Sequence, residues 1–134
     1  MIAVLKNRVV PRLRKSGFSG RFPHFRRYAG ESVHLLTFQF DRRGGGFVVE
    51  VAACPAAGAR MHWGETVPAE KVTAHDVQHR LRLGADGPGA DHWSRYDTKG
   101  IFFWRDPCHR VADELLPLLD GQAEQYWRKE AARW

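Results

Sequence analysis

Two histidines spaced four residues apart are the feature of this sequence that most suggests chemistry. They belong to the string His75-Asp76-Val77-Gln78-His79. On a helix such a pair would point the same way and could share a zinc ion, as in the H-E-x-x-H pattern of metalloproteases. Asp76, however, stands where that pattern has the longer glutamate base, and no third ligand follows at a recognisable distance. We therefore expect histidines at the surface or at a strand end, and we predict no metal site.

The other side chains that could bind a metal or exchange protons are scattered along the chain. The histidines and cysteines without a testable spacing are His24, His34, His62, His92, Cys54 and Cys108. Carboxylates that could form an acid–base pair are Glu50, Glu65, Glu70, Asp76 and Asp91. Such chemistry depends on distances that a sequence does not give. Whether these groups meet in space stays open at this point.

Sequence motifs for nucleophilic catalysis and for phosphate binding are missing. There is no G-x-S-x-G elbow and no P-loop. The glycines at 44–46 lead into an apolar alternating run rather than a helix, so they predict a hairpin loop. We predict no catalytic residue and no cofactor, and a binding protein rather than an enzyme.

Positive charge is concentrated at the start of the chain. Residues 1–30 carry eight basic side chains and no acidic one, whereas the net charge of all 134 residues is +6. An acidic partner would be drawn to this segment. Phe18, Phe22, Phe25 and Tyr28 lie among its arginines, a mixture typical of proteins that bind single-stranded nucleic acid. The same aromatic residues fall where a strand needs core residues.

These observations favour a binding module that recognises an acidic partner protein. Arginine and tryptophan are common anchors of such interfaces. The predicted site residues are Arg26, Arg27, Arg42, Arg43, Asp91 and Trp93. Two alternatives remain: a nucleic-acid-binding domain that uses the basic N-terminal third, and a small metal-dependent hydrolase built from the scattered histidines with Asp91 and Trp93.

Helices are predicted at both ends of the chain. Ile2, Leu5, Val9 and Leu13 lie three and four residues apart, which predicts an amphipathic helix that ends near residue 16. Pro11 is expected to kink this helix or to start a new turn. The last helix is predicted to begin at 106–107, where Asp can cap it and Pro fits its first position. We expect a kink at Pro117 and a break at 120–121.

Strands are predicted between the two helices. Apolar and polar residues alternate over 33–41 and 47–52, which predicts a hairpin, and an earlier strand is expected at 22–28. A fourth strand is predicted at 79–83 and a short extended stretch at 101–104. Residues 55–75 show no clean period and are expected to form a loop with a short helix after Pro68.

Together these elements predict one α+β domain over residues 1–134. Its single, mainly antiparallel sheet has four or more strands and is packed by an N-terminal helix and a long C-terminal helix. The apolar content of 43% is that of a globular protein. Two cysteines without close partners, no signal peptide and no apolar span predict a cytoplasmic location and no membrane partner.

The order of residues also resembles a bacterial family, the domain of unknown function 4304. The matching features are the helix that ends at Gly17-Phe18, the Phe25-Arg26 pair, the strand with Gln39, the Arg80 to Gly84 strand, and Asp91 with Trp93 before the last helix. Ser19-Gly20 and His92 depart from the family pattern. The resemblance implies an α+β fold and supplies no activity, and some small bacterial domains of this kind look like immunity or toxin-associated proteins.

Overall fold

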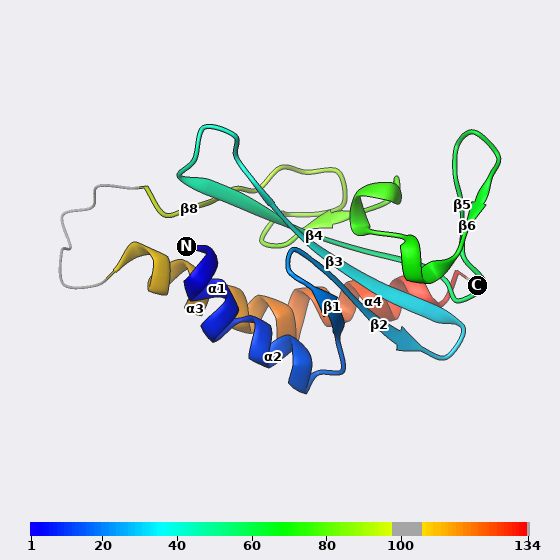
Figure 1. The fold of residues 1–134 in the computed structure, drawn as a ribbon, viewed down its shortest axis with the longest axis horizontal. Coiled ribbons are helices and arrows are strands. Elements are labelled where there is room, and N and C mark those ends of the chain that lie inside the picture. Colours follow the sequence, from blue (N-terminus) through cyan, green and yellow to red (C-terminus); the bar gives the residue numbers. More distant parts are fainter. Residues whose placement is uncertain (98–105, 134) are drawn as a thin grey trace.

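A computed structural model describes residues 1–97 and 106–133 (Figure 1). Helices from the two ends of the chain lie side by side on one face of an antiparallel sheet, and residues 56–93 run over its other face or along its edge. This arrangement confirms the predicted α+β fold, with its N-terminal helix and its long C-terminal helix. The predicted extended stretch at 101–104 lies outside the described residues.

The N-terminal helix is divided at Val9 into two short pieces. These are α1 (Ile2–Arg8) and α2 (Val10–Lys15). Pro11 lies in the first turn of α2, where a missing backbone N–H is tolerated. Leu5, Val9 and Leu13 are buried, as the spacing predicts, and Gly17 leaves the helix with a φ of 95°.

Six strands form the main sheet, which exceeds the predicted minimum of four. They are β1 (Ser19–Arg21), β2 (His24–Ala29), β3 (Ser32–Phe40), β4 (Gly46–Pro55), β7 (Leu81–Arg82) and β8 (Ser94–Arg95). The order is β1-β2-β3-β4-β7, and β8 also pairs with β4. The predicted strand at 79–83 is therefore confirmed only over its central two residues, since β4 offers β7 only Glu50 and Val51 as partners.

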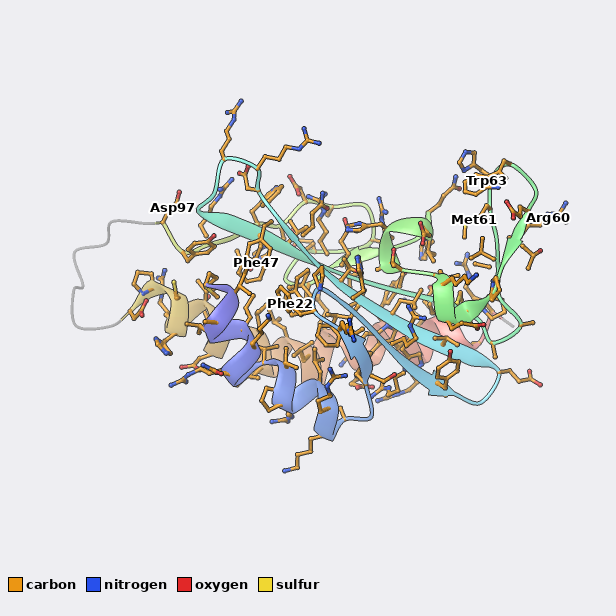
Figure 2. The ribbon with its side chains drawn as sticks, viewed as in Figure 1. Phe22, Phe47, Arg60, Met61, Trp63 and Asp97 are labelled. Atoms are coloured by element: carbon orange, nitrogen blue, oxygen red, sulfur yellow. The ribbon has the colours of Figure 1, made fainter. Side chains whose placement is uncertain are left out.

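The face of the sheet toward the helices carries the larger core. Phe25, Phe38 and Val49 contribute from consecutive strands, and Phe47 is also fully buried. Figure 2 shows Phe22 and Phe47 between the sheet and α1. Because side chains alternate along a strand, the intervening residues of β3 and β4, among them Leu35 and Ala52, point to the opposite face.

The C-terminal helix runs from α3 (Pro107–Leu118) through a π-helical turn (Leu119–Ala123) to α4 (Glu124–Ala131). Asp106 caps it by accepting from the backbone N–H of Cys108 at 2.8 Å, as predicted. The predicted break at 120–121 is wrong. Leu119 and Ala123 are buried in the core on either side of it, and this packing holds the helix together across Gly121.

Residues 56–77 form a second, smaller core on the sheet face that the helices do not cover. The elements there are β5 (Ala59–Arg60), β6 (Thr66–Val67) and two 3₁₀ helices, η1 (Ala69–Lys71) and η2 (Ala74–Asp76). Val72 and Ala74 pack on Leu35 and Ala52 of the sheet. The short helix predicted after Pro68 is η1, whereas the packed layer around it was not predicted. Met61 and Trp63 lie on the β5–β6 hairpin in Figure 2.

None of the helices in residues 1–97 and 106–133 is long and apolar enough to cross a bilayer.

Candidate functional site

Part of the positive charge of residues 1–30 is paired with acidic residues of the chain itself. Three of its arginines pair with acidic residues of the C-terminal helix. The pairs are Arg8 with Asp113, Arg12 with Asp120, and Arg27 with Glu124. The basic segment therefore holds the two ends of the chain together, which limits the charge left for an external partner.

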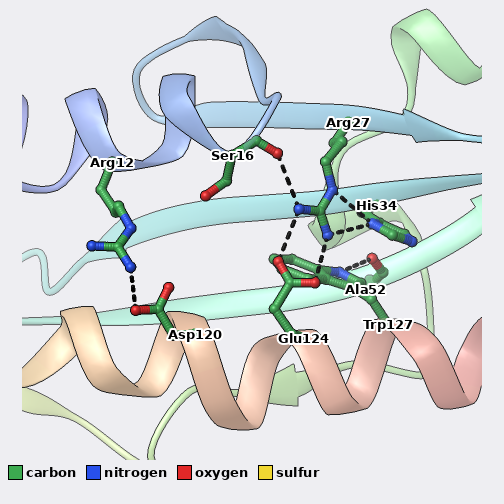
Figure 3. A network of polar contacts seen from close by, with 8 residues as sticks. All are labelled: Arg12, Ser16, Arg27, His34, Ala52, Asp120, Glu124 and Trp127. Atoms are coloured by element: carbon green, nitrogen blue, oxygen red, sulfur yellow. Dashed lines mark hydrogen bonds and ion pairs between the residues drawn. The ribbon is translucent and has the colours of Figure 1, made fainter.

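Arg27 is the centre of a polar network between the sheet and the C-terminal helix (Figure 3). Its guanidinium group donates to both carboxylate oxygens of Glu124, at 2.8 and 2.9 Å. It also donates to Nδ1 of His34 at 3.0 Å and to the backbone oxygen of Ser16 at 3.1 Å. A planar guanidinium group that donates to this many aligned acceptors is rigidly held. Arg27, a predicted site residue, is thus occupied by the chain itself.

The rings of Phe18 and Trp127 lie over the guanidinium group of Arg27, and the Phe18 centroid is 4.6 Å from its central carbon. The guanidinium carbon of Arg27 lies 5.2 Å from the ring centroid of Trp127, and the His34 ring stacks on the same tryptophan at 5.3 Å. Trp127 donates through Nε1 to the backbone oxygen of Ala52 at 2.9 Å. Desolvation by burial, followed by the charge of Arg27, lowers the pKa of His34 to about 4. His34 is therefore neutral near pH 7, as an acceptor for Arg27 must be.

Arg26 is also held within the fold, on the opposite face of the sheet. Its two terminal nitrogens donate to the backbone oxygens of Ala69, at 3.3 Å, and Val72, at 3.1 Å. These bonds fasten η1 to β2. Of the aromatic residues near it in sequence, Phe18 and Phe25 are core residues, whereas Tyr28 is exposed.

Arg42 and Arg43 are exposed at the β3–β4 turn. Arg26 is paired with Leu35 of β3, so the turn lies roughly 20 Å further along the strand. The structure therefore does not bring the four predicted arginines into one patch. Beside the turn, Arg95 donates to Asp41 at 3.1 Å, and the backbone N–H of Arg43 donates to the same aspartate at 3.0 Å. That N–H, with Arg95, lowers the pKa of Asp41.

Asp91 and Trp93, the two remaining predicted residues, do come together. Both contact Arg82 of β7: Asp91 accepts a hydrogen bond from its Nη1, and the Trp93 ring centroid lies 5.6 Å from its guanidinium carbon. Arg95 lies at 5.3 Å from the same ring. Trp93 is therefore half-buried and stacked on two cations, which fixes its orientation.

A row of polar side chains crosses four strands of the sheet face that carries the smaller core. His24, Thr37, Glu50 and Arg82 are successive cross-strand partners in β2, β3, β4 and β7. Nδ1 of His24 and the hydroxyl of Thr37 are 3.0 Å apart. Both Thr37 and Glu50 are buried. Polar groups in consecutive positions across an otherwise apolar sheet are costly, because each must be desolvated.

Glu50 is the buried charge at the centre of this row. Its side chain is only 3% exposed and is surrounded by three side chains that can carry positive charge. Nδ1 of His75 lies 2.9 Å from its Oε2, Nε of Arg80 3.5 Å from Oε2, and Nε of Arg82 3.4 Å from Oε1. None of these contacts is aligned as a hydrogen bond to Oε2, which has no such partner among the described residues. The charge is compensated, but its hydrogen bonding is incomplete.

A cleft of about 520 Å³ opens over Glu50, a volume in the usual range for small-molecule sites. Arg80 and Arg82 form one part of its lining, and residues 88–91 form another, which ends at Asp91. Gln78 and His79 complete it. The cleft therefore combines a buried carboxylate, two guanidinium groups and one exposed carboxylate.

The histidines of the 75–79 string do not form a metal site. Only residues 74–76 are helical, as a single 3₁₀ turn capped by Thr73, so the two rings do not share a face. His75 contacts Glu50, whereas Nε2 of His79 lies 3.3 Å from Glu130 on α4. Within the described part of the chain no three His, Cys, Asp or Glu side chains are arranged to hold a metal ion.

The family model described as "Domain of unknown function (DUF4304)" matches residues 9–121. The chain belongs to the DUF4304 family. The matched segment of this DUF4304 domain includes every strand of the sheet and the whole cleft lining. No curated protein and no solved structure matches the chain.

Sequence reasoning placed Asp91 among the site residues and Glu50 among the candidate carboxylates of this DUF4304 domain, but it did not bring Arg80 and Arg82 together with them. Glu50 is the one charged residue in the apolar run 47–54, a pattern that signals a buried carboxylate. Arg80 and Arg82 alternate along one strand and therefore share a face. No signal in the sequence indicated that this face meets Glu50.

Proposed function

We propose that this DUF4304 domain is a non-enzymatic binding module that recognises an acidic segment of a partner protein. The recognition surface is the arginine turn, which we define as Arg42, Arg43, Trp93 and Arg95. Arg42, Arg43 and Trp93 of this surface are among the site residues that were predicted from the sequence. Arg26 and Arg27 are left out of it because their side chains bind the chain's own groups.

One observation carries this proposal: the guanidinium groups of Arg42 and Arg43 are exposed and form no ion pair within residues 1–97 and 106–133. Asp41 is already paired with Arg95, and Asp97 is the other acid near the turn. Trp93 is stacked on Arg82 and on Arg95, and Arg95 donates to Asp41 of the turn, so this tryptophan could contact a partner with little loss of side-chain entropy. Unpaired arginines and a tryptophan held in place match the composition of protein interfaces.

The basic N-terminal third suits nucleic acid less well than its composition predicts. Single-stranded nucleic acid needs exposed aromatic faces beside the basic groups. Of the four aromatic residues in this segment, Phe18 and Phe25 are in the core and Phe22 packs against it, which leaves Tyr28 as the exposed ring. Of the basic residues that precede them, Arg8 and Arg12 are paired with the C-terminal helix.

The test uses a fluorescent oligoglutamate peptide and a single-stranded DNA of equal charge, each titrated at low and high salt. We expect the peptide to bind, its affinity to fall with added salt, and the DNA to bind more weakly. Replacing Arg42 and Arg43 by glutamine should abolish peptide binding. The matched control is Lys15→Gln with Arg21→Gln, which removes the same charge from exposed positions near β1. Preferential DNA binding, or equal loss in both double variants, would overturn the proposal.

The proposal also places the domain in the cytoplasm. Both cysteines are free thiols, and Cys54 is buried in the smaller core. Desolvation by burial raises the pKa of the Cys54 thiol to about 11, which keeps it protonated and unreactive. Free thiols of this kind suit a reducing compartment.

A further inference from the structure

Arg80 and Arg82 are arranged so that one buried carboxylate holds both. They are separated by one residue on the segment that contains β7, and both approach Glu50 through Nε, at 3.5 and 3.4 Å. Two guanidinium groups side by side would repel each other in the absence of Glu50. With their Nε edges facing Glu50, their terminal nitrogens are directed elsewhere. Nη1 of Arg80 donates to the backbone oxygen of His75 at 2.8 Å, and Nη1 of Arg82 to Asp91.

Asp91 occupies a position that a ligand could take. Its side chain is 68% exposed and follows the Gly87-Pro88-Gly89 turn, whereas Arg82 is 29% exposed. Apart from Asp91, the two arginines and Glu50 leave one excess positive charge in the cleft. An exposed carboxylate on a half-buried arginine gains little from the pair, because solvent screens it and its side-chain entropy is lost. An external anion can therefore compete with Asp91 for Arg82.

We propose that the cleft over Glu50 binds a small organic anion, through a carboxylate or phosphate group held by Arg80 and Arg82. Glu50 positions the two arginines, and the anion replaces Asp91 on Arg82. The volume of about 520 Å³ fits a metabolite-sized ligand. This site uses arginines other than Arg42 and Arg43, so it does not depend on the proposed function.

The test is calorimetric titration of the full chain at constant ionic strength with three probes. Glutarate represents carboxylates, phenyl phosphate represents phosphate esters, and glutaramide is the neutral control. We expect saturable one-to-one binding of at least one anion and none of glutaramide. The anion that binds with the higher affinity identifies the class of ligand. If neither anion binds, or if only the oligoglutamate peptide does, the proposal of a small-ligand site is wrong.

Variants of the cleft give results of opposite sign. Arg82→Gln should weaken anion binding about tenfold or more, the effect of one lost charge-assisted hydrogen bond. Arg82→Lys keeps the positive charge but loses the planar guanidinium group, so its affinity for the anion should lie between those of the wild type and Arg82→Gln. Asp91→Asn should strengthen binding severalfold, because it removes the competing carboxylate. Arg43→Gln is the matched control and should leave binding unchanged.

The sign of the Asp91 effect separates a ligand site from a structural ion pair. If Asp91 only stabilises the loop, Asp91→Asn weakens anion binding or leaves it unchanged, and either result overturns the proposal. So does wild-type affinity in a folded Arg82→Gln protein. Near-ultraviolet circular dichroism, which reports on the packed tryptophans, shows whether each variant is folded. Arg82→Lys keeps the test valid if Arg82→Gln does not fold.

Discussion

The network around Arg27 and the cleft over Glu50 use the same three side-chain types in opposite arrangements. In the first, an arginine is central, and a glutamate, a histidine and a backbone oxygen accept from its guanidinium group. In the second, a glutamate is central and two arginines and a histidine surround it. The guanidinium group of Arg27 is fully bonded and lies under the rings of Phe18 and Trp127, although Nε2 of its partner His34 has no hydrogen bond among the described residues. Glu50 has an oxygen without a hydrogen bond and lies beneath an open cleft. The comparison shows that the same side-chain types can form a closed structural network in one place and line a cleft in another.

The largest expected effect tests the structural side of this comparison. Arg27→Leu removes every bond of the central fork and leaves the His34 and Ser16 acceptors buried without a donor. We expect the free energy of unfolding to fall by about 2–4 kcal/mol, as for other broken buried pairs. Urea unfolding measures it. Arg12→Gln is the control: its pair with Asp120 is exposed, so the loss should stay below about 1 kcal/mol. Similar losses in both variants would contradict a central role for Arg27.

The next effect is a pH dependence that belongs to the same network. Burial and Arg27 lower the pKa of His34 from its ordinary 6.5 to about 4. Between these two pH values the unfolded chain binds more protons than the folded chain does, so the free energy of unfolding should fall as the pH drops from about 6.5 to about 4. Below about pH 4, His34 should contribute little further change. We expect this residue to contribute about 1–3 kcal/mol of that fall.

His34→Gln isolates this contribution. Glutamine keeps an acceptor for Arg27 but does not titrate, so its stability curve should be flatter over the same pH range. Urea unfolding at pH 7, 6, 5 and 4 compares the two proteins. Parallel curves would show that His34 is not held neutral by the fold.

The smallest expected change in stability compares Glu50 of the cleft with Glu124 of the Arg27 network. Glu50→Gln removes the attraction to Arg80 and Arg82 but also the cost of a buried, incompletely bonded charge, so we expect stability to change by no more than about 1 kcal/mol. Glu124→Gln breaks an aligned bidentate pair and should cost about 1–2 kcal/mol. A larger loss for Glu50→Gln than for Glu124→Gln would place Glu50 among the groups that hold the fold together.

The sequence alone determined the elements whose signals are local. Leu5, Val9 and Leu13 lie at helical spacing, the residues of β3 and β4 alternate, and Asp106 with Pro107 begins the last helix. Each of these signals depends on neighbours within a few residues, and the structure confirms each one. The break predicted at 120–121 was wrong because the burial of Leu119 and Ala123 outweighs the local signal.

Only the tertiary structure decided which charges are free. Arg26 and Arg42 look alike in the sequence, but Arg26 binds backbone oxygens 43 and 46 residues away, whereas Arg42 is exposed at a turn. Glu50 meets Arg82 because β7 pairs with β4 in one register, and a shift of one residue would turn Arg82 to the other face. Charge is a property of a residue, but its compensation depends on partners that are distant in the chain. Sequence reasoning therefore found the basic residues, and the fold determined which of them the chain itself pairs.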